Sequence, residues 1–398
     1  MNDAVHGAHP YAGLRVLELS EDIGGEFLGR LLAEMGAEVI KVEHPRGAPT
    51  RAIGPFANGQ EGPENSLTFW YYNNNKRGVT IDYEASLEPL SALLADRDIF
   101  ITTMQPARLA ELGLDLYAVA EAHPALIVVS ITAYGLTGPW KDYKPSNLVA
   151  LAGGGPLFMC GYDDHSIPPI NPGGDQAYHT ATTQAHIGLL AALIHRQATG
   201  LGQVLDISMH SANAVNMELG NPYWFYPKAN VLRQTCRHAQ PVMTNSPLFQ
   251  CGDGRYVYYT LILGDEKAWI ILVEWMEEKG LAAQLTDPEY SELAFRQTHF
   301  DEIQTLVECF FLLMDANEAY LEGQRRGLPI GIVNAPEDLF NDEHLRARSF
   351  FVEIDMGPEH GPVVFPGEGY RFTAFGSVPR HRAPRLGEHN AEVLGKAE

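Results

Sequence analysis

Short apolar runs alternate with helical apolar spacing along the first half of the chain. Residues 14–19 (LRVLEL) predict a strand, residues 25–35 carry apolar side chains at helical spacing, and residues 38–42 (EVIKV) predict a second strand. A β-α-β opening of this kind favours an α/β fold with a parallel sheet covered by helices. The same patterns continue with strands expected at 79–81, 98–101, 125–131 and 204–209, and helices at 87–95 and 177–197.

The texture of the sequence changes near residue 221. An aromatic and proline-rich run, NPYWFYP, precedes a β-rich and helical stretch, and a proline-containing tail follows residue 361. A chain of 398 residues is long enough for two domains. We expect a large domain at 1–220 and 360–398, a linker at 221–245, a smaller α+β domain at 246–340 and a return linker at 341–359.

Charge and composition exclude several classes of partner. A formal charge of -22 opposes binding to nucleic acid or to an anionic membrane surface, because both are polyanions. No window approaches the continuous apolar length of a membrane helix, and the N-terminus lacks the basic and apolar regions of a secretory signal. We therefore expect a cytoplasmic protein whose anionic ligands bind at a local basic pocket.

The four cysteines, at positions 160, 236, 251 and 309, show no paired CxxC spacing. Neither a disulfide framework nor a zinc site is indicated, and we expect buried free thiols and no bound metal.

The opening β-α-β unit is typical of dinucleotide-binding folds, but the turn after its first strand lacks the glycine spacing of such a site. A phosphate cradle needs the spacing G-x-G-x-x-G, whereas this turn reads SEDIGGEFLG and places Asp22 and Glu26 where the phosphates would lie. Binding of NAD or FAD is therefore disfavoured.

Two further motifs each allow a structural and a functional interpretation. In NNNKRG, Lys76 and Arg77 either bind phosphates or lie in a solvated turn. In GGD, Asp175 either caps the following helix or presents a carboxylate nucleophile, with the backbone N–H groups of Gly153, Gly154 and Gly155 as oxyanion donors. His179 and His186 on that helix are either packed side chains or acid–base groups.

Several separated motifs, in one order, resemble the class III CoA-transferase (CaiB/BaiF) family, which includes formyl-CoA transferase, carnitine CoA-transferase and acyl-CoA racemases. The resemblance runs from Tyr11 to about Val257 and is weaker beyond. The matching segments are GLRVLEL, LLAEMGAEVIKVEHP, NNNKRGVTID, SITAYGLTGP, GGDQAYHTATTQAHIGLLAALIHRQATGLGQVLDISM and FQCGDGRYV.

The resemblance implies a Rossmann-like large domain built from both chain ends, with the smaller domain inserted between them. It also implies an interlocked homodimer, with a heteromer containing a paralogous chain as an alternative. Acyl-CoA and a small carboxylic acid are the implied substrates, and no permanently bound cofactor is implied.

Position by position, the resemblance places the family's nucleophile at Asp175. A family arginine falls near Glu111, and Arg108, one turn earlier, is the expected replacement. The family's glycine-repeat lid is absent, because the corresponding stretch reads RHAQPVMTNSP, so an oxalate and formate pair is not indicated. The family's other CoA-contacting positions fall on Ile23, Gly24, His44, Lys76, Thr103, Met104 and Tyr134.

This assignment implies that Asp175 attacks an acyl-CoA thioester and carries coenzyme A as an aspartyl thioester. A racemase is one alternative, but the histidine that family racemases use falls at Lys144. A non-catalytic partner subunit is another, although Asp175 is present. The aromatic run at 223–226 either lines an acyl pocket or packs at a domain junction.

Overall fold

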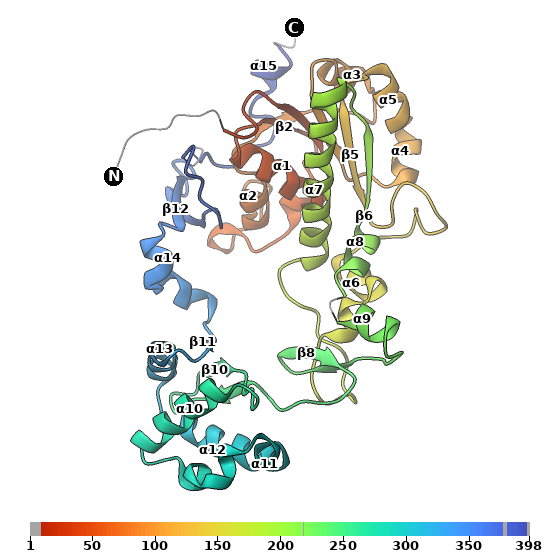
Figure 1. Cartoon of the computed structure of the whole chain (residues 1–398). Coiled ribbons are helices and arrows are strands. Elements are labelled where there is room, and N and C mark those ends of the chain that lie inside the picture. Colours follow the sequence, from red (N-terminus) through yellow and green to blue (C-terminus); the bar gives the residue numbers. More distant parts are fainter. Residues whose placement is uncertain (1–8, 218, 377–379, 396–398) are drawn as a thin grey trace. The chain divides into compact units, whose positions relative to one another are not determined.

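The computed structural model describes residues 9–217, 219–376 and 380–395, so most of the N-terminal leader lies outside the described residues (Figure 1). The chain divides into two compact units, which are described separately. Unit 1 contains residues 1–157, 171–217 and 345–398, and unit 2 contains residues 158–170 and 218–344. Much of the expected linker at 221–245 is therefore folded within unit 2, and part of the expected return linker belongs to unit 1.

Unit 1 is built on a six-stranded sheet in the order β3-β2-β1-β4-β5-β6, with every pairing parallel. The predicted parallel sheet is confirmed. Its strands are β1 (Arg15–Leu19), β2 (Glu38–Glu43), β3 (Arg77–Thr80), β4 (Ile99–Thr102), β5 (Ile127–Thr132) and β6 (Val204–Ser208).

Helices cover both faces of this sheet. Successive strand residues alternate between faces, so Val16 packs with the side chains of α1 and α7, whereas Leu17 packs with those of α3 and α4. The helices of unit 1 are α1 (Ile23–Glu34), α2 (Leu67–Asn73), α3 (Glu88–Leu94), α4 (Pro106–Leu112), α5 (Leu116–Ala122), α6 (Asn147–Gly154), α7 (Gln176–Thr199), α8 (Met209–Val215) and α15 (Asn390–Val393).

The remaining structure of unit 1 comes from the C-terminal part of the chain. The hairpin of β12 (Phe351–Asp355) and β13 (Pro362–Pro366) packs through Ile354 and Phe365 with side chains of α2. In the N-terminal part of unit 1, short 3₁₀ turns lie at Pro49–Ala52 and Ala57–Gly59, and a third, at Pro156–Met159, crosses the boundary between the units.

Unit 2 has its own core, centred on Trp275, Phe310 and Phe311, over the antiparallel sheet β11-β10-β9. Its strands are β7 (Leu232–Gln234), β8 (Arg237–Gln240), β9 (Leu248–Gln250), β10 (Tyr256–Tyr259) and β11 (Ile330–Ile332). Its helical segments are α9 (Gly220–Phe225), α10 (Glu266–Glu278), α11 (Leu293–Thr298), α12 (Phe300–Leu312), α13 (Ala316–Arg326) and 3₁₀ turns at Ala283–Thr286, Pro288–Ser291 and Pro336–Asn341; α14 (Glu343–Ala347) crosses the boundary between the units.

The sequence suggested that all four cysteines are buried, but only one of them is. Cys251 is buried and Cys160 is half-buried, whereas Cys236 and Cys309 are exposed. All four are free thiols. Within the described ranges, no helix is long and apolar enough to cross a bilayer, and no group of three or more potential ligand residues could hold a metal ion.

Four charged side chains form a buried ion group beneath α1. Glu18 lies between two lysines, with Oε1 3.2 Å from Lys41 Nζ and Oε2 2.7 Å from Lys76 Nζ. Lys41 Nζ is also 2.8 Å from Glu26 Oε1. All four side chains are fully buried. Because an unpaired charge inside a protein costs several kcal/mol, these four must be brought together as the sheet forms.

Backbone and neutral groups complete the ion group. Lys76 Nζ donates to the carbonyl oxygen of Glu26 at 2.7 Å and to Asn73 Oδ1 at 2.8 Å, and Thr50 Oγ1 donates to Glu26 Oε1 at 2.6 Å. Burial lowers the pKa of Lys76 to about 8, although the Glu18 charge opposes this shift. For Lys41 the glutamates outweigh the cost of burial, and its pKa is raised.

The first prediction concerns Gly29, which leaves room for Glu18. A Cβ at position 29 would lie 1.8 Å from Glu18 Oε2, and Glu18 cannot withdraw without leaving a lysine unpaired. We expect Gly29→Ala to lower the free energy of unfolding by about 3 kcal/mol. In the control Gly188→Ala the nearest atoms are 3.9 Å away, so helix propensity should dominate and stability should be unchanged or rise by up to about 1 kcal/mol. Urea unfolding of both variants checks this, and an equally stable Gly29→Ala would contradict it.

The second prediction concerns Asp22, which caps α1 by accepting a hydrogen bond from Gly24 N–H at 2.9 Å. Burial raises its carboxyl pKa to about 7, and the charges of Glu26 and Glu21 add to the shift. Ionisation therefore costs more in the folded than in the unfolded state, so the wild type loses stability as the pH rises from about 4 to about 7.

Asparagine caps a helix as well as aspartate but does not titrate. The melting temperature of Asp22→Asn minus that of the wild type should therefore increase as the pH is raised through this window. Above the window this difference should stay constant. Thermal unfolding of both proteins across the window measures the difference. A difference that does not change with pH would show that Asp22 ionises normally in the fold.

Candidate functional site

Six of the residues implied to contact coenzyme A follow strands at one edge of the sheet of unit 1. Carboxyl ends of parallel strands meet at a common edge, and in this strand order the direction of winding reverses between β1 and β4, which opens a crevice there. Ile23 and Gly24 follow β1, His44 follows β2, Thr103 and Met104 follow β4, and Tyr134 follows β5.

Hydrogen bonds join the loops on the two sides of this crevice. The backbone N–H of Glu21 donates to Thr103 Oγ1 at 2.9 Å, and Thr182 Oγ1 on α7 donates to the carbonyl oxygen of Gly24 at 2.7 Å. A Cβ at Gly24 would lie 3.4 Å from the ring of Tyr178. The first turns of α1 and α7 therefore lie together at this edge, and the two helices run along the same face of the sheet (Figure 1).

Asp175 precedes the first turn of α7 but does not cap it. Its backbone is left-handed, with φ 52° and ψ 41°, and its side chain makes no capping hydrogen bond to any described residue. Asn147, the first residue of α6, performs that role, because its Oδ1 accepts from Ala177 N–H at 2.9 Å. The interpretation of Asp175 as a helix cap is therefore wrong. Asp175 is half-buried, and its carboxylate does not accept a hydrogen bond from the first turn of α7.

The Asp175 charge acts on two tyrosine side chains and one histidine side chain. Tyr72 Oη on α2 lies 2.7 Å from His179 Nε2, one turn after Asp175, and the ring of Phe27 is 4.8 Å from the ring of His179. Burial lowers the pKa of His179, and the Asp175 charge partly opposes this shift. Burial raises the pKa values of Tyr72 and Tyr178, and the Asp175 charge contributes to both. Asp175 therefore lies in the electrostatic reach of three ring side chains.

The second histidine of α7 has a packing role. His186 Nε2 lies 2.7 Å from Tyr11 Oη, and burial lowers the pKa of the imidazole. Tyr11 belongs to the core on this face of the sheet, so the hydrogen bond favours the packed interpretation of His186.

The NNNKRG segment does not present its charges to a ligand, in contrast to one interpretation of the sequence. The ammonium group of Lys76 is enclosed by Glu18, the Glu26 carbonyl and Asn73, as described above. Arg77 pairs with Glu38 and with Glu392 Oε1, the latter at 2.6 Å. The expectation that Lys76 contacts a phosphate is therefore corrected, because its buried ammonium group is already paired with Glu18.

A basic group does exist at the same edge of the sheet, around Glu84. Arg108 pairs with Glu84 and also, at 3.2 Å, with Glu111, the residue that replaces the family's arginine. Arg46 NH2 lies 3.0 Å from Glu84, and His44 Nε2 lies 3.7 Å from it. Arg46 was not identified from the sequence, because nothing near it in the chain indicates its neighbours across the sheet edge.

Gly153, Gly154 and Gly155 are not the open backbone that the sequence suggested. Gly153 and Gly154 belong to the last turn of α6, where N–H groups serve the helix, and Gly155 ends it with φ 102°. A Cβ at Gly154 would lie 2.7 Å from Asn213 Cβ, and one at Gly155 would lie 2.1 Å from Met217 Sδ. These glycines allow α6 to pack closely on α8, so we do not retain them as oxyanion donors.

An aromatic cluster that the sequence analysis did not identify follows β5. The ring centroid of Tyr134 lies 6.0 Å from those of Trp140 and Tyr143 and 5.5 Å from that of His210. Trp140 and Tyr143 stack at 6.3 Å and are both exposed. The neighbouring Lys144 is exposed, as an ordinary surface lysine would be.

The other implied aromatic surface belongs to unit 2. Trp224, Phe225 and Tyr226 at the end of α9 are all exposed. Whether they line an acyl pocket or pack at a domain junction stays a prediction.

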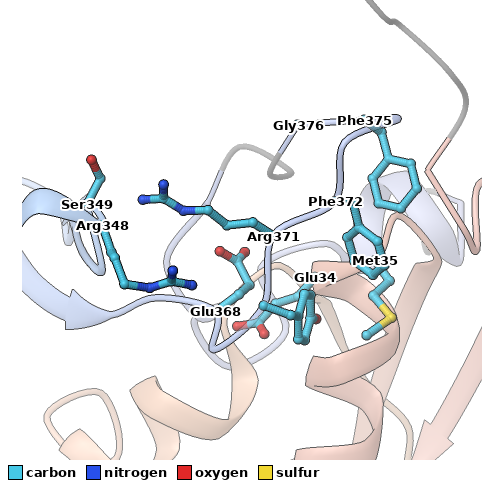
Figure 2. Close-up of a pocket in the computed structure, with 10 residues that line it drawn as sticks. Glu34, Met35, Arg348, Ser349, Glu368, Arg371, Phe372, Phe375 and Gly376 are labelled. Carbon is cyan, nitrogen blue, oxygen red and sulfur yellow. The ribbon is translucent and has the colours of Figure 1, made fainter. Parts of the chain in front are cut away.

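A cavity of about 420 Å³ lies elsewhere in unit 1 and is separate from the residues implied by the resemblance (Figure 2). Glu34 and Met35, at the C-terminal end of α1, are part of its lining. The candidate site lies at the other end of this 12-residue helix, which is about 18 Å long.

Curated proteins similar to this chain are CoA-transferases. Succinyl-CoA:(R)-benzylsuccinate CoA-transferase subunit BbsE of Thauera aromatica is 29% identical over 391 residues, covering 96% of this chain and 93% of that protein. Succinate–glutarate CoA-transferase of Agrobacterium fabrum is 27% identical over 405 residues, covering 100% and 98%.

Solved structures show the same fold. A CAIB/BAIF family protein from Brucella suis aligns with a TM-score of 0.83 and 25% identity, covering 98% of this chain and 99% of that one. A hypothetical protein from Mycobacterium tuberculosis aligns with a TM-score of 0.76 and 23% identity, covering 97% and 99%. The model of one family, described as CoA-transferase family III, matches residues 11–390, and the chain therefore belongs to CoA-transferase family III.

Proposed function

We propose that this chain transfers coenzyme A from an acyl-CoA to a carboxylic acid, with Asp175 as the covalent nucleophile. The observation that carries the proposal is that Asn147, and not Asp175, caps the start of α7. Asn147 caps the helix at Ala177, so the Asp175 carboxylate is available for chemistry. Its left-handed backbone, a conformation that costs energy in a residue with a side chain, is a further feature typical of functional sites.

The reaction balances with the atoms of Asp175 and the two substrates. The carboxylate attacks the donor thioester, forms a mixed anhydride and releases CoA thiolate, which then attacks the aspartyl carbonyl. The donor leaves as a free carboxylate, and coenzyme A remains as a thioester on Asp175. The acceptor carboxylate repeats the two steps in reverse, and the products are a new acyl-CoA and the original Asp175 carboxylate.

The phosphates of coenzyme A need positive charge at the carboxyl edge of the sheet. We assign this role to His44, Arg46 and Arg108 rather than to the buried Lys76, because the former group lies at the edge where Ile23, Gly24, Thr103 and Met104 gather. Arginine forks match phosphate oxygens well, and a chain of charge -22 must concentrate such groups locally. No permanently bound cofactor takes part in this scheme.

Relatives suggest the class of acids. Proteins similar to this chain are named for succinyl-CoA with benzylsuccinate, D-citramalate and mesaconate, which are dicarboxylic acids or hydroxy derivatives of them. We therefore propose succinyl-CoA as donor and a dicarboxylic acid as acceptor. Lys144 is exposed like an ordinary surface lysine, and racemisation is not part of the proposal.

Assembly is part of the proposal. We propose an interlocked homodimer acting in the cytoplasm, where the two units of each chain enclose part of the partner. Relatives named as subunits, BbsE and the two malate transferase subunits, make a heteromer with a paralogue the competing arrangement. Activity of this chain when purified alone supports the homodimer, and activity that requires a second chain supports the heteromer.

Stability measurements separate the two roles at the start of α7. We expect Asp175→Asn to leave the free energy of unfolding nearly unchanged, because its side chain accepts no capping bond in the described structure and asparagine tolerates the left-handed backbone. Asn147→Ala should lower it by about 1 kcal/mol, because Ala177 N–H loses its acceptor. Urea unfolding of both variants decides the matter. A larger loss of stability in Asp175→Asn than in Asn147→Ala would show that Asp175 is the residue that caps α7.

Chemical trapping tests the nucleophile directly. Succinyl-CoA without an acceptor acid should load Asp175, and hydroxylamine should then convert it to a hydroxamate on the peptide that contains NPGGD, which mass spectrometry detects. Asp175→Asn should lower turnover by roughly a thousandfold or more. The matched control is Asp115→Asn, because Asp115 does cap α5, accepting from Tyr117 N–H at 2.9 Å, and its activity should match the wild type. Full activity in a folded Asp175→Asn protein would refute the proposal.

A further inference from the structure

The cavity at the C-terminal end of α1 has two chemically different sides. Figure 2 shows the guanidinium groups of Arg348 and Arg371 on one side, and Phe372, Phe375 and Met35 on the other. We propose that this cavity is a second ligand site, which binds a small organic anion carrying a flat apolar group. The proposal does not depend on the reaction assigned to Asp175.

The charged side of the cavity has positive charge to spare. Its two carboxylates are neutralised, because Glu34 Oε1 lies 2.7 Å from Arg30 Nε and 2.6 Å from Arg380 NH1, and Glu368 Oε1 lies 3.0 Å from Arg380 NH2. The guanidinium groups of Arg348 and Arg371 make no ion pair or hydrogen bond with another described residue, and both residues are exposed. In an acidic chain, two unpaired guanidinium groups that line one cavity indicate an anion as their partner.

The apolar side is formed by rings. The ring centroids of Phe372 and Phe375 are 4.3 Å apart with an interplanar angle of 36°, and Tyr370 lies 5.1 Å from Phe372. Ring faces and edges arranged in this way accept a further flat group by stacking, and the thioether of Met35 is a favourable neighbour for it. Burial and the nearby Glu34 and Glu368 raise the pKa of Tyr370 to about 12, so its hydroxyl stays a hydrogen-bond donor at neutral pH.

Size and position fit a ligand that is distinct from the acyl-CoA. A volume of about 420 Å³ is within the usual range of small-molecule sites. The length of α1 separates the cavity from the crevice at Ile23 and Gly24, so a small ligand cannot bridge the two. The class of ligand is therefore an anionic oxygen group attached to an aromatic or similarly flat group, and coenzyme A at the other end should not compete with it.

Naphthoate, a flat aromatic carboxylate, is the probe for this site. Titration of the full chain, followed by calorimetry, should show one bound molecule per chain. The double substitution Arg348→Gln with Arg371→Gln should weaken binding roughly tenfold or more, because both charge-assisted contacts are lost. Arg325→Gln removes one exposed positive charge from a residue that does not line the cavity, and it should leave the affinity unchanged. The uncharged amide of naphthoate should bind more weakly than naphthoate.

Competition distinguishes this cavity from the proposed CoA site. Excess coenzyme A should leave the naphthoate affinity unchanged, and the Asp175→Asn variant should bind naphthoate like the wild type. Displacement of naphthoate by coenzyme A would overturn the proposal, because it would place the probe in the crevice. Absence of binding, or equal affinity in the wild type and the double variant, would overturn it as well. Since none of these measurements uses turnover, their outcome is independent of whether Asp175 is the nucleophile.

Discussion

The buried ion group of Glu18, Lys41, Lys76 and Glu26 is the constraint on which unit 1 depends. Its members come from β1, β2, α1 and the segment before β3, so satisfying the four charges fixes where these elements lie. The loss of any one partner would leave a charge without compensation in a region that water does not reach. Gly29 is part of the same arrangement, because only a residue without a side chain leaves space for the Glu18 carboxylate.

This constraint also determines which positive charges remain for a ligand. Lys76 is paired in the interior, whereas Arg46 and Arg108 pair with Glu84 at the sheet edge and stay accessible to solvent. The resulting separation is physically reasonable, since a buried lysine cannot reach a phosphate without breaking its pair with Glu18. The same helix, α1, connects the crevice at its first turn to the cavity lined by Glu34 and Met35 at its end.

At the start of α7, the carboxylate that we propose as the nucleophile does not cap the helix. An aspartate before a long helix would ordinarily accept a backbone N–H. Here the amide oxygen of Asn147 does so, and Asp175 adopts a left-handed backbone among Tyr72, Tyr178 and His179. The Tyr72–His179 hydrogen bond holds one wall of this site in place. Positioning of this kind is what the proposed attack on a thioester requires.

Local patterns in the sequence were sufficient to place the six strands of the parallel sheet and the helices α1 and α7. Apolar periodicity located β1, β2, α1 and α7 within one or two residues, because side-chain alternation and helical spacing are properties of neighbouring positions. Ordered motifs were sufficient to indicate the family. The sequence did not identify the buried state of Lys76, the packing role of Gly153 to Gly155 or the cap supplied by Asn147. These depend on residues brought together by tertiary folding, such as Asn147 and Ala177, 30 positions apart, and Lys76 and Glu26, 50 positions apart, so only the folded chain decides them.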